Sequence, residues 1–233
     1  MANESKKFYQ FIKLLQFQLN KFKSGAVYFV IDKKSKDETL NLCKELQQID
    51  PRFRTIRSPN NRNVVDAYIA GYKAAVKKNY QFIIEMDAGL SHDPKELYNF
   101  LKELNSGYQC VFGSRFINGG SISESNWKRI FLSKVGTYLS NVLLGTRLHD
   151  ATSGYQGFHI KIVKKFIKYP FKSEAHFYQT ELRFLLRKIK FIEIPINYKS
   201  PSPSVSTNSL INSIKVLLYY FFLRIILKAP QII

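Results

Sequence analysis

A largely apolar run over residues 82–86 ends at Asp87, and a short turn containing Gly89 and His92 leads to Pro94. The run predicts a buried strand, and proline is favoured in the first turn of a helix that follows. In α/β folds, ligands bind at the edge formed by the carboxyl ends of the strands. A carboxylate there can hold a divalent cation on a diphosphate, because hard cations prefer carboxylate oxygens. Taken alone, these residues also fit an ordinary polar turn after a strand.

The alternation of apolar runs and amphipathic segments continues along the whole chain. Apolar runs predict strands at residues 26–31, 53–57, 81–86, 108–113, 155–160 and 190–198, the last interrupted at Pro195. Helices are predicted at residues 8–22, 37–48, 64–78, 94–105, 126–144, 161–168, 176–188 and 208–228. Such alternation is typical of an α/β fold with a mainly parallel central sheet and helices on both faces. We expect one domain over residues 1–206, followed by an apolar helix within 207–233.

Composition limits the partners of the chain. Its 233 residues carry a formal net charge of +19, which favours polyanions such as anionic lipid head groups or phosphorylated substrates. No stacking motif or recognition helix is present, so we expect no nucleic-acid partner. Cys43 and Cys110 form no CxxC pair, which favours reduced thiols. We find no signal-peptide pattern and no run of about 18 uncharged apolar residues, and therefore expect no full transmembrane helix.

Several polar motifs follow one another in a fixed order. They are Asp32, Asn61, the Asp87–Pro94 segment, Gly113-Ser114-Arg115-Phe116, Arg129 with Ser133, and Asp150-Ala151-Thr152-Ser153-Gly154. This series resembles family-2 glycosyltransferases of the GT-A fold. The resemblance is closest to polyprenyl-phosphate sugar transferases of the dolichol-phosphate mannosyltransferase type and extends over about residues 2–206. It implies a nucleotide-diphospho-sugar transferase fold and hexosyltransferase activity with inversion at the anomeric carbon.

The resemblance also bears on the N-terminus. The family opens with a strand that ends in a Pro-x-Tyr-Asn-Glu turn, and residues 2–5, Ala-Asn-Glu-Ser, match the end of that turn. The strand itself is absent from the sequence. We therefore expect a fold that lacks the first strand, and a sequence that is truncated or begins at the wrong start.

The resemblance assigns the donor side of the site to the N-terminal half of the chain. Asn3 and Glu4 are expected to border the nucleotide pocket, and Asp32 is expected to contact the base or the ribose. Asp87 would anchor Mg²⁺ or Mn²⁺ on the diphosphate of a UDP- or GDP-linked sugar, and Ser91, Asp93 and His92 are the candidates to complete the metal shell.

Two segments depart from the family pattern on this side. The family usually has Asp-x-Asp, whereas this chain has Gly89 at the second position, which leaves its dependence on a metal open. The usual Arg-x-x-Gly-x-Ser segment is replaced by residues 199–206, in which Lys199 or the serines are expected to close over the diphosphate.

The acceptor side is assigned to the later motifs. Arg115 is expected to engage phosphate, and Arg129 and Ser133 share one helix face on which they would grip an acceptor phosphate. Asp150 begins a turn near the sugar and the acceptor. Glu181 either touches the donor sugar or caps a helix, and the sequence leaves both interpretations open.

The acceptor decides whether a base is needed. A polyprenyl phosphate, such as dolichyl or undecaprenyl phosphate, is already anionic near neutral pH and needs none. A saccharide hydroxyl, as in surface-polysaccharide synthesis, would need a carboxylate base, and Asp150 and Glu181 are the candidates. A third hypothesis is a catalytically degenerate scaffold protein.

The C-terminal helix favours a lipid partner. Its apolar part, residues 214–227, would extend for about 21 Å, which is shorter than ~30 Å of hydrocarbon. We therefore expect an interfacial anchor on the cytoplasmic side of an anionic membrane, with peripheral attachment. A helix that covers the sheet or forms an oligomer contact is the alternative.

Overall fold

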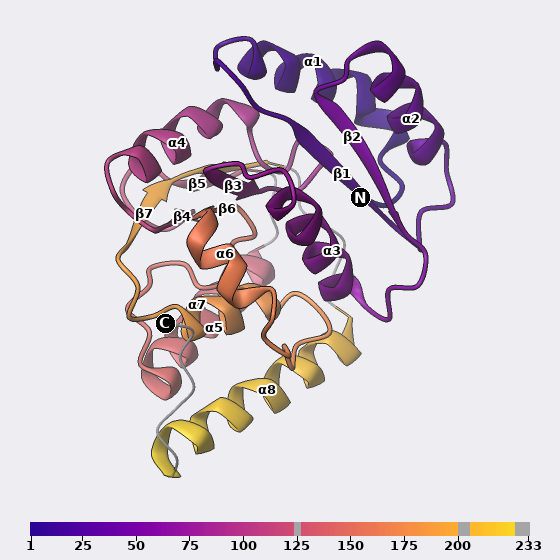
Figure 1. The fold of residues 1–233 in the computed structure, drawn as a ribbon. Coiled ribbons are helices and arrows are strands. Elements are labelled where there is room, and N and C mark those ends of the chain that lie inside the picture. Colours follow the sequence, from indigo (N-terminus) through magenta and orange to yellow (C-terminus); the bar gives the residue numbers. More distant parts are fainter. Residues whose placement is uncertain (124–126, 200–205, 227–233) are drawn as a thin grey trace.

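The computed structural model describes residues 1–123, 127–199 and 206–226, and its strands form three sheets (Figure 1). The strands are β1 (Val27–Asp32), β2 (Phe53–Ser58), β3 (Phe82–Glu85), β4 (Cys110–Ser114), β5 (Ser121–Ile122), β6 (Gln156–His159), β7 (Phe191–Pro195) and β8 (Asn197–Tyr198). β1 pairs with β2, the four-stranded sheet has the order β3-β6-β4-β7, and β5 pairs with β8.

Strand directions confirm an α/β fold with parallel sheets and add one antiparallel strand. The pairs β1–β2, β4–β7 and β5–β8 are parallel. β6 runs antiparallel to both of its neighbours, β3 and β4, so the central sheet is mixed. It follows that β3, β4 and β7 run in one direction and end at the same edge. Asp87 and Arg115 follow two of these ends.

No strand joins the two larger sheets within the described residues. On the edge of β1 that faces away from β2, the amino group of Met1 donates to the carbonyl of Val30 at 2.6 Å. The amide of Asp32 in turn donates to the carbonyl of Met1 at 2.9 Å. This alternation of bonds is that of a parallel ladder. Met1 therefore extends the β1–β2 sheet at that edge.

Helices cover both faces of the sheets, as predicted. They are α1 (Phe8–Leu19), α2 (Thr39–Ile49), α3 (Val64–Val76), α4 (Leu97–Asn105), α5 (Trp127–Leu139), α6 (Ile160–Phe166), α7 (Tyr178–Leu185) and α8 (Thr207–Ile226). Short helical turns precede α1 at Ser5–Lys7, precede α4 at Pro94–Glu96 and follow α5 at Ser140–Leu144. α1 and α2 pack on β1–β2, while α4 and α6 lie on opposite faces of the four-stranded sheet (Figure 1).

Helix α7 is unusual because all eight of its residues are buried. Several of them are polar, so their hydrogen bonds must be made inside the protein. Thr180 donates to the carbonyl of Ala151 at 2.9 Å, which ties α7 to the turn that begins at Asp150. The helix therefore acts as an internal support for that turn.

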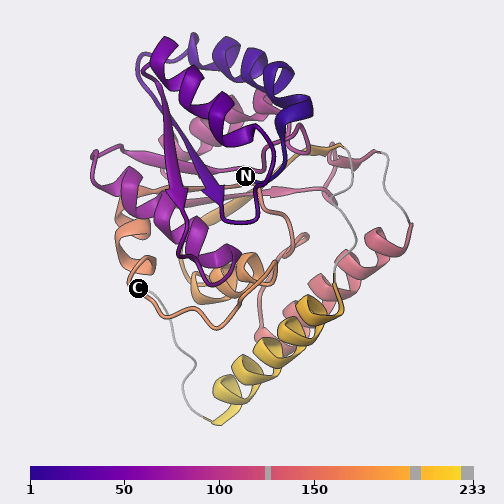
Figure 2. The ribbon, with the colours of Figure 1, turned by 90° about the vertical axis from the view of Figure 1, so that its right-hand side faces the viewer.

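Helix α8 corrects the length argument made from the sequence. The helix predicted at residues 208–228 is present as α8, and its 20 residues are long and apolar enough, by length and composition, to cross a membrane, whereas the length argument counted only residues 214–227. The expectation that this helix is too short to span is therefore not supported. Figure 2 shows α8 beside α5, and Arg224 of α8 donates to the carbonyl of Leu143 at 2.9 Å.

Both of these helices expose large apolar side chains, which we call the α5–α8 surface. It consists of Trp127, Phe131, Leu132, Tyr138, Leu139, Val142, Leu210, Ile211, Ile214, Leu218, Tyr219, Phe222, Ile225 and Ile226. Scattered single apolar residues are normal on a protein surface, but a concentration of this kind marks an interaction surface.

Candidate functional site

The turn after β3 presents the carboxylate that the sequence predicted. The backbone amide of Asp87 donates to Nδ1 of His92 at 2.9 Å, which closes the turn. Gly89 and Leu90 have φ values of +79° and +71°, so the backbone doubles back in the left-handed region that Leu rarely adopts. The side chain of Asp87 remains 37% exposed. The turn thus directs this carboxylate toward solvent at the sheet edge.

His92 is buried beneath this turn. It is 1% exposed, and its ring stacks on Tyr155 with centroids 4.8 Å apart. Burial lowers its pKa, and the charge of Arg115 lowers it as well, although Asp87 acts in the opposite direction. The net effect is a neutral imidazole. Because Nδ1 accepts the amide of Asp87, the neutral ring carries its proton on Nε2.

Tyr198, at the end of β8, brings separate parts of the site together. Its ring centroid lies 5.5 Å from that of His92, and the guanidinium carbons of Arg115 and Arg129 lie 5.6 and 5.8 Å from it. Arg129 also reaches the Tyr198 hydroxyl at 3.5 Å. Sequence reasoning missed this residue because a tyrosine in a strand is ordinarily read as core.

The strand end that holds Tyr198 is attached directly to the Asp87 turn. The amide of Lys199 donates to the carbonyl of Ser91 at 2.9 Å. Its ammonium lies 3.5 Å from Asp93 Oδ2, while the side chain is 56% exposed. Lys199 therefore lies at the rim of the site, next to Ser91.

Arg115 and Asp150 form a buried pair. Arg115 Nε and Nη2 donate to the two Asp150 oxygens at 2.6 and 2.8 Å, and the Arg115 amide adds a third bond at 3.0 Å. Arg115 also donates to the Thr152 hydroxyl at 2.6 Å. Burial opposes ionisation of Asp150, but the bonds from Arg115 outweigh it and lower the carboxyl pKa. Much of the guanidinium is thus engaged inside the protein.

Arg183 of α7 supports the same turn and was not foreseen from the sequence. Its guanidinium donates to the carbonyl of Asp150, and to that of Ser153 at 2.7 Å. Complete burial lowers its pKa to about 10. A charged residue on an amphipathic helix is usually solvated, and the sequence pattern gave no sign that this one is internal.

The first residues of the chain lie against the loop after β1 and the start of α2. The backbone amides of Glu4 and Ser5 donate to Thr39 Oγ1 at 2.8 Å and Asp37 Oδ2 at 3.0 Å. Asn3 has a φ of +58° and accepts the amide of Lys36 through its side chain at 2.9 Å. This segment is thereby fixed against the loop after β1.

Glu4 lies directly against the Asp87 turn. A Cβ built on Gly89 would lie 2.9 Å from Glu4 Cδ and 3.2 Å from Glu4 Oε1, so the Glu4 carboxylate fills the space beside Gly89. Burial raises the pKa of Glu4, and the nearby charge of Asp87 raises it further, against the amino group of Met1. Two carboxylates from distant parts of the sequence thus share this edge.

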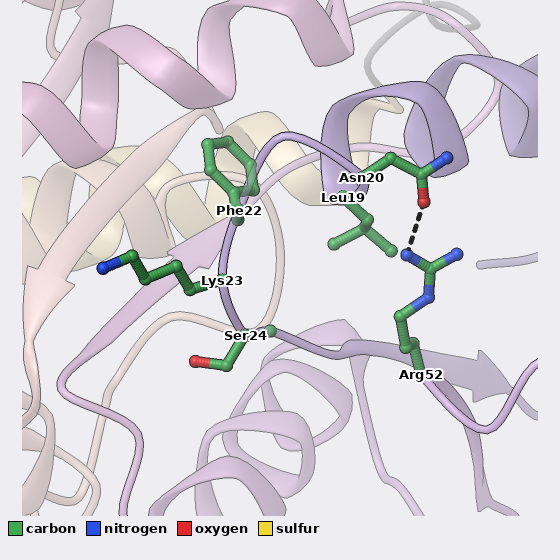
Figure 3. Close-up of a pocket in the computed structure, with 7 residues that line it drawn as sticks. Leu19, Asn20, Phe22, Lys23, Ser24 and Arg52 are labelled. Atoms are coloured by element: carbon green, nitrogen blue, oxygen red, sulfur yellow. Dashed lines mark hydrogen bonds between the residues drawn. The ribbon is translucent and has the colours of Figure 1, made fainter.

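Asp32 is bonded at the end of β1, and its partner Asn61 lines a hollow. Its Oδ2 accepts Asn61 Nδ2 at 2.8 Å, and its Oδ1 accepts the amide of Lys34 at 2.8 Å. The hollow has a volume of about 380 Å³, and Asn61 and Lys73 are among its lining residues. A second hollow, of about 500 Å³, is lined by Leu19 and Arg52 among others and lies at the opposite, amino end of β1 (Figure 3). The chemistry lies at the carboxyl ends, so the second hollow is not part of the site.

The structure does not bring Glu181 into this group. Its carboxylate is fully buried and accepts the amides of Lys172 and Ser173, both at 2.8 Å, and the hydroxyl of Tyr220 at 2.6 Å. These bonds join α7 to the segment before it and, through Tyr220, to α8. Ser133 lies one turn after Arg129 on α5, on the same face of that helix.

A divalent cation fits the donor side of the site. Among residues 1–123, 127–199 and 206–226, no three His, Cys, Asp or Glu side chains form a metal-binding group. Mg²⁺, however, is commonly held by one or two carboxylates together with substrate phosphates, and Mn²⁺ accepts the same ligands. The open carboxylate of Asp87, with Glu4 and Ser91 nearby, is a donor set of that kind.

The strand order, the carboxylate edge and the supported Arg115–Asp150 turn define a GT-A-type nucleotide-sugar transferase fold. Solved structures of glucosyl-3-phosphoglycerate synthase from Mycobacterium tuberculosis share it. The complex with phosphoglyceric acid matches with a TM-score of 0.64 and 14% identity, over 94% of this chain and 76% of that one. The complex with Mn²⁺ and UDP-glucose matches with a TM-score of 0.64 and 13% identity, over 96% and 76%.

The sequence places the chain within this class. The family model for glycosyl transferase family 2 matches residues 3–167, and the chain belongs to that family. It is 31% identical to polyprenol monophosphomannose synthase of Mycolicibacterium smegmatis over 183 residues, which cover 77% of this chain and 69% of that protein. It is 26% identical to undecaprenyl-phosphate mannosyltransferase of Micrococcus luteus over 171 residues, or 72% and 70%. The chain is therefore a glycosyltransferase.

Proposed function

We propose that this glycosyltransferase moves a hexose from a UDP- or GDP-linked donor to the phosphate of a polyprenyl lipid, with inversion at the anomeric carbon. The names of its two relatives, a polyprenol monophosphomannose synthase and an undecaprenyl-phosphate mannosyltransferase, support a lipid phosphate as the acceptor. An acceptor phosphate oxygen forms the new bond to the anomeric carbon, and the nucleoside diphosphate leaves.

This proposal rests on the burial and hydrogen bonding of Asp150 and Glu181, the two candidate bases. A hydroxyl acceptor needs a carboxylate that can take its proton, and such a group must reach the acceptor. Asp150 and Glu181 are both fully buried, and internal bonds occupy their carboxylates. A lipid phosphate is already ionised near neutral pH, because its second pKa is about 6, and needs no base. The geometry therefore favours a phosphate over a hydroxyl.

On the donor side, we assign Asp87 and Ser91 to the divalent metal and Asn3, Glu4 and Asp32 to the nucleotide. When bound, Mg²⁺ or Mn²⁺ would neutralise the diphosphate as it leaves. Asp87 is suited to this role by the backbone bond to His92, which fixes its turn while the carboxylate stays open.

Lys199 is assigned to the same leaving group. It stands beside Ser91 at the rim, where its ammonium can leave Asp93 for a phosphate without breaking a buried bond. A lysine acts on phosphate as a flexible point charge, which suits a group that must release its product.

On the acceptor side, we assign Arg129 and Ser133 to the lipid phosphate. Both lie on α5, which also carries part of the α5–α8 surface. A phosphate held there would have its lipid chain beside exposed apolar side chains. Arg115 is assigned to orienting this end of the site, because Asp150 holds its guanidinium in place and Tyr198 lies between it and Arg129.

The α5–α8 surface is assigned to a membrane. We propose peripheral attachment on the cytoplasmic face, with the apolar side chains at the level of the lipid head groups and acyl chains. Lys215 and Arg224 of α8 and Lys134 of α5 add positive charge, which favours an anionic membrane.

The test is a transfer assay on the full chain. Radiolabelled UDP- and GDP-hexoses are supplied with undecaprenyl or dolichyl phosphate and with Mg²⁺ or Mn²⁺. We expect label to pass into the organic phase only when the lipid phosphate is present, and to be lost in Asp87→Asn. Anomeric configuration in the product reports inversion. Label in a water-soluble saccharide would favour a hydroxyl acceptor, and nucleotide binding without any transfer would favour a scaffold role.

A further inference from the structure

Position 89 shows what has replaced the usual second aspartate. Built on Gly89, a Cβ would lie 2.9 Å from Glu4 Cδ and closer still to Glu4 Oε2, which is tighter than atoms can pack. The space at which a side chain of residue 89 would begin is therefore already filled by the carboxylate of Glu4. Gly89 leaves room for a carboxylate that comes from a different segment.

The chain holds Glu4 in this position through its backbone. The amide of Glu4 donates to the Thr39 hydroxyl at 2.8 Å, and Thr39 itself is fully buried. The amide of Ser5 donates to Asp37 at 3.0 Å. Because these anchors, in the loop after β1 and at the start of α2, bind the backbone, the placement of Glu4 does not depend on its own carboxylate, which stays available to a ligand.

A buried polar side chain without a complete set of partners lies beside the other carboxylate, that of Asp87. A Cβ built on Gly154 would lie 3.5 Å from both Asp87 Oδ1 and Gln179 Nε2, so these two side chains border one space. Gln179 is 3% exposed, and its Oε1 has no hydrogen-bond partner in the described part of the chain. Buried polar groups without partners usually indicate a missing ligand or water.

We propose that Glu4 supplies the second carboxylate of the divalent-cation site, with Asp87 as the first, so that the pair Asp87–Glu4 replaces the pair Asp-x-Asp. The assignment rests on the proposed function, since the cation is the one that accompanies the donor diphosphate. It implies that Gly89 and Glu4 depend on each other: the glycine removes one carboxylate and admits another.

The test measures cation binding directly. Mn²⁺ is titrated into the full chain with UDP or GDP, and free Mn²⁺ is followed by its electron paramagnetic resonance signal. Changes in the surroundings of a ligand cost about 10–100-fold in affinity, so loss of a direct ligand should cost at least about tenfold. We expect that loss for Glu4→Gln and for Asp87→Asn. Glu45→Gln, which removes an exposed charge, should bind Mn²⁺ as the wild type does.

A second pair of variants separates the carboxylate from the shape of the site. Adding Gly89→Asp to Glu4→Ala, which empties the space beside residue 89, restores a carboxylate at the usual position, and Asp is among the residues that tolerate a positive φ. We expect this double variant to recover Mn²⁺ affinity. The matched control, Glu4→Ala with Gly89→Asn, has the same shape without the charge and should not recover it. Melting temperatures establish that each variant is folded.

The outcomes distinguish this inference from the function on which it rests. Wild-type Mn²⁺ affinity in Glu4→Gln, with loss in Asp87→Asn, would overturn the role of Glu4. Nucleotide binding that is indifferent to Mn²⁺ would also overturn it, while the proposed transfer would stand. Failure to bind either nucleotide, in a folded protein, would remove both.

Discussion

Asp87 and Asp150 both belong to turns at the site, yet the structure treats them in opposite ways. Asp87 is anchored through its backbone amide, and its side chain is 37% exposed. Asp150 is fully buried and is anchored through its carboxylate, which receives three bonds from Arg115. The first arrangement leaves a charge free for a ligand, and the second uses the charge to build the fold.

This difference extends to the neighbouring residues, because one half of the site exposes its charged groups and the other half buries them. The half that we propose for the donor keeps the carboxylates of Asp87 and Glu4 near solvent and fixes them through backbone bonds. The half that we propose for the acceptor buries the charges of Arg115, Asp150 and Arg183 to hold one turn rigid. The proposed phosphate acceptor requires rigidity more than it requires an exposed acid.

The largest expected effect is on stability at Asp150. Asp150→Asn keeps the shape of the side chain but leaves Arg115, which is 6% exposed, without its counter-charge. Breaking a buried pair by removing one partner typically costs about 3–5 kcal/mol. Urea denaturation should show a fall of that size in the free energy of unfolding. Asp66→Asn, in the exposed Arg62–Asp66 pair, should change it far less. Equal losses in both variants would mean that burial does not distinguish these pairs.

The same carboxylate makes a prediction about pH. Its folded-state pKa is lowered, so its contribution is complete above the unfolded value of about 4 and is lost as pH falls through the folded value. The gap in unfolding free energy between wild type and Asp150→Asn should therefore be constant near neutral pH and narrow below about pH 4. Denaturation curves across this range measure it. A gap that persists at the lowest pH would show that charge is not the cause.

Asp87 should give the reverse result. Asp87→Asn is expected to reduce sugar transfer by about 100-fold, in the range seen when one electrostatic group is removed from an active site. Its free energy of unfolding should stay within about 0.5 kcal/mol of wild type, because the carboxylate is partly exposed. Transfer rates and urea denaturation on the same preparation check both halves. A variant that loses stability as well would place Asp87 with Asp150 as a structural residue.

Much of this architecture could be predicted from the sequence because it depends on local pattern. The strand at 81–86 appears as β3 (Phe82–Glu85), and the strand interrupted at Pro195 appears as β7 and β8. Apolar runs and proline constrain the backbone wherever they occur, so these elements did not require tertiary information. The antiparallel direction of β6 was missed, because direction is set by how the chain crosses between strands.

The site was predictable only in part, for a physical reason. Motif order located Asp87 and Arg115, but a motif does not reveal burial, and burial decides whether a charge meets a ligand or another residue. Arg183 and Glu181 sit in a helix whose sequence looks amphipathic, yet that helix is wholly internal. The approach of Glu4 to Gly89 joins positions far apart in the chain, and no local spacing encodes it.

The smallest expected effects concern the α5–α8 surface, which extends the comparison to a third environment. Phe222 is 55% exposed, and burying a phenylalanine in an apolar phase is worth about 1.5–3 kcal/mol. Phe222→Ser should therefore weaken binding to lipid vesicles by about tenfold or more, on neutral and anionic vesicles alike. Lys215→Gln should weaken it by about fivefold, near 1 kcal/mol, and only on anionic vesicles.

Co-sedimentation with vesicles of each composition separates these two contributions. Tyr98 provides the matched control, since it is 59% exposed on α4, outside the α5–α8 surface, and Tyr98→Ser should leave vesicle binding unchanged. If Tyr98→Ser lowered binding as much as Phe222→Ser does, any exposed aromatic residue would serve equally. The α5–α8 surface would then not be a specific lipid-binding surface. The position of Arg129 and Ser133 beside it would in that case not explain how a lipid-linked phosphate reaches the sheet edge.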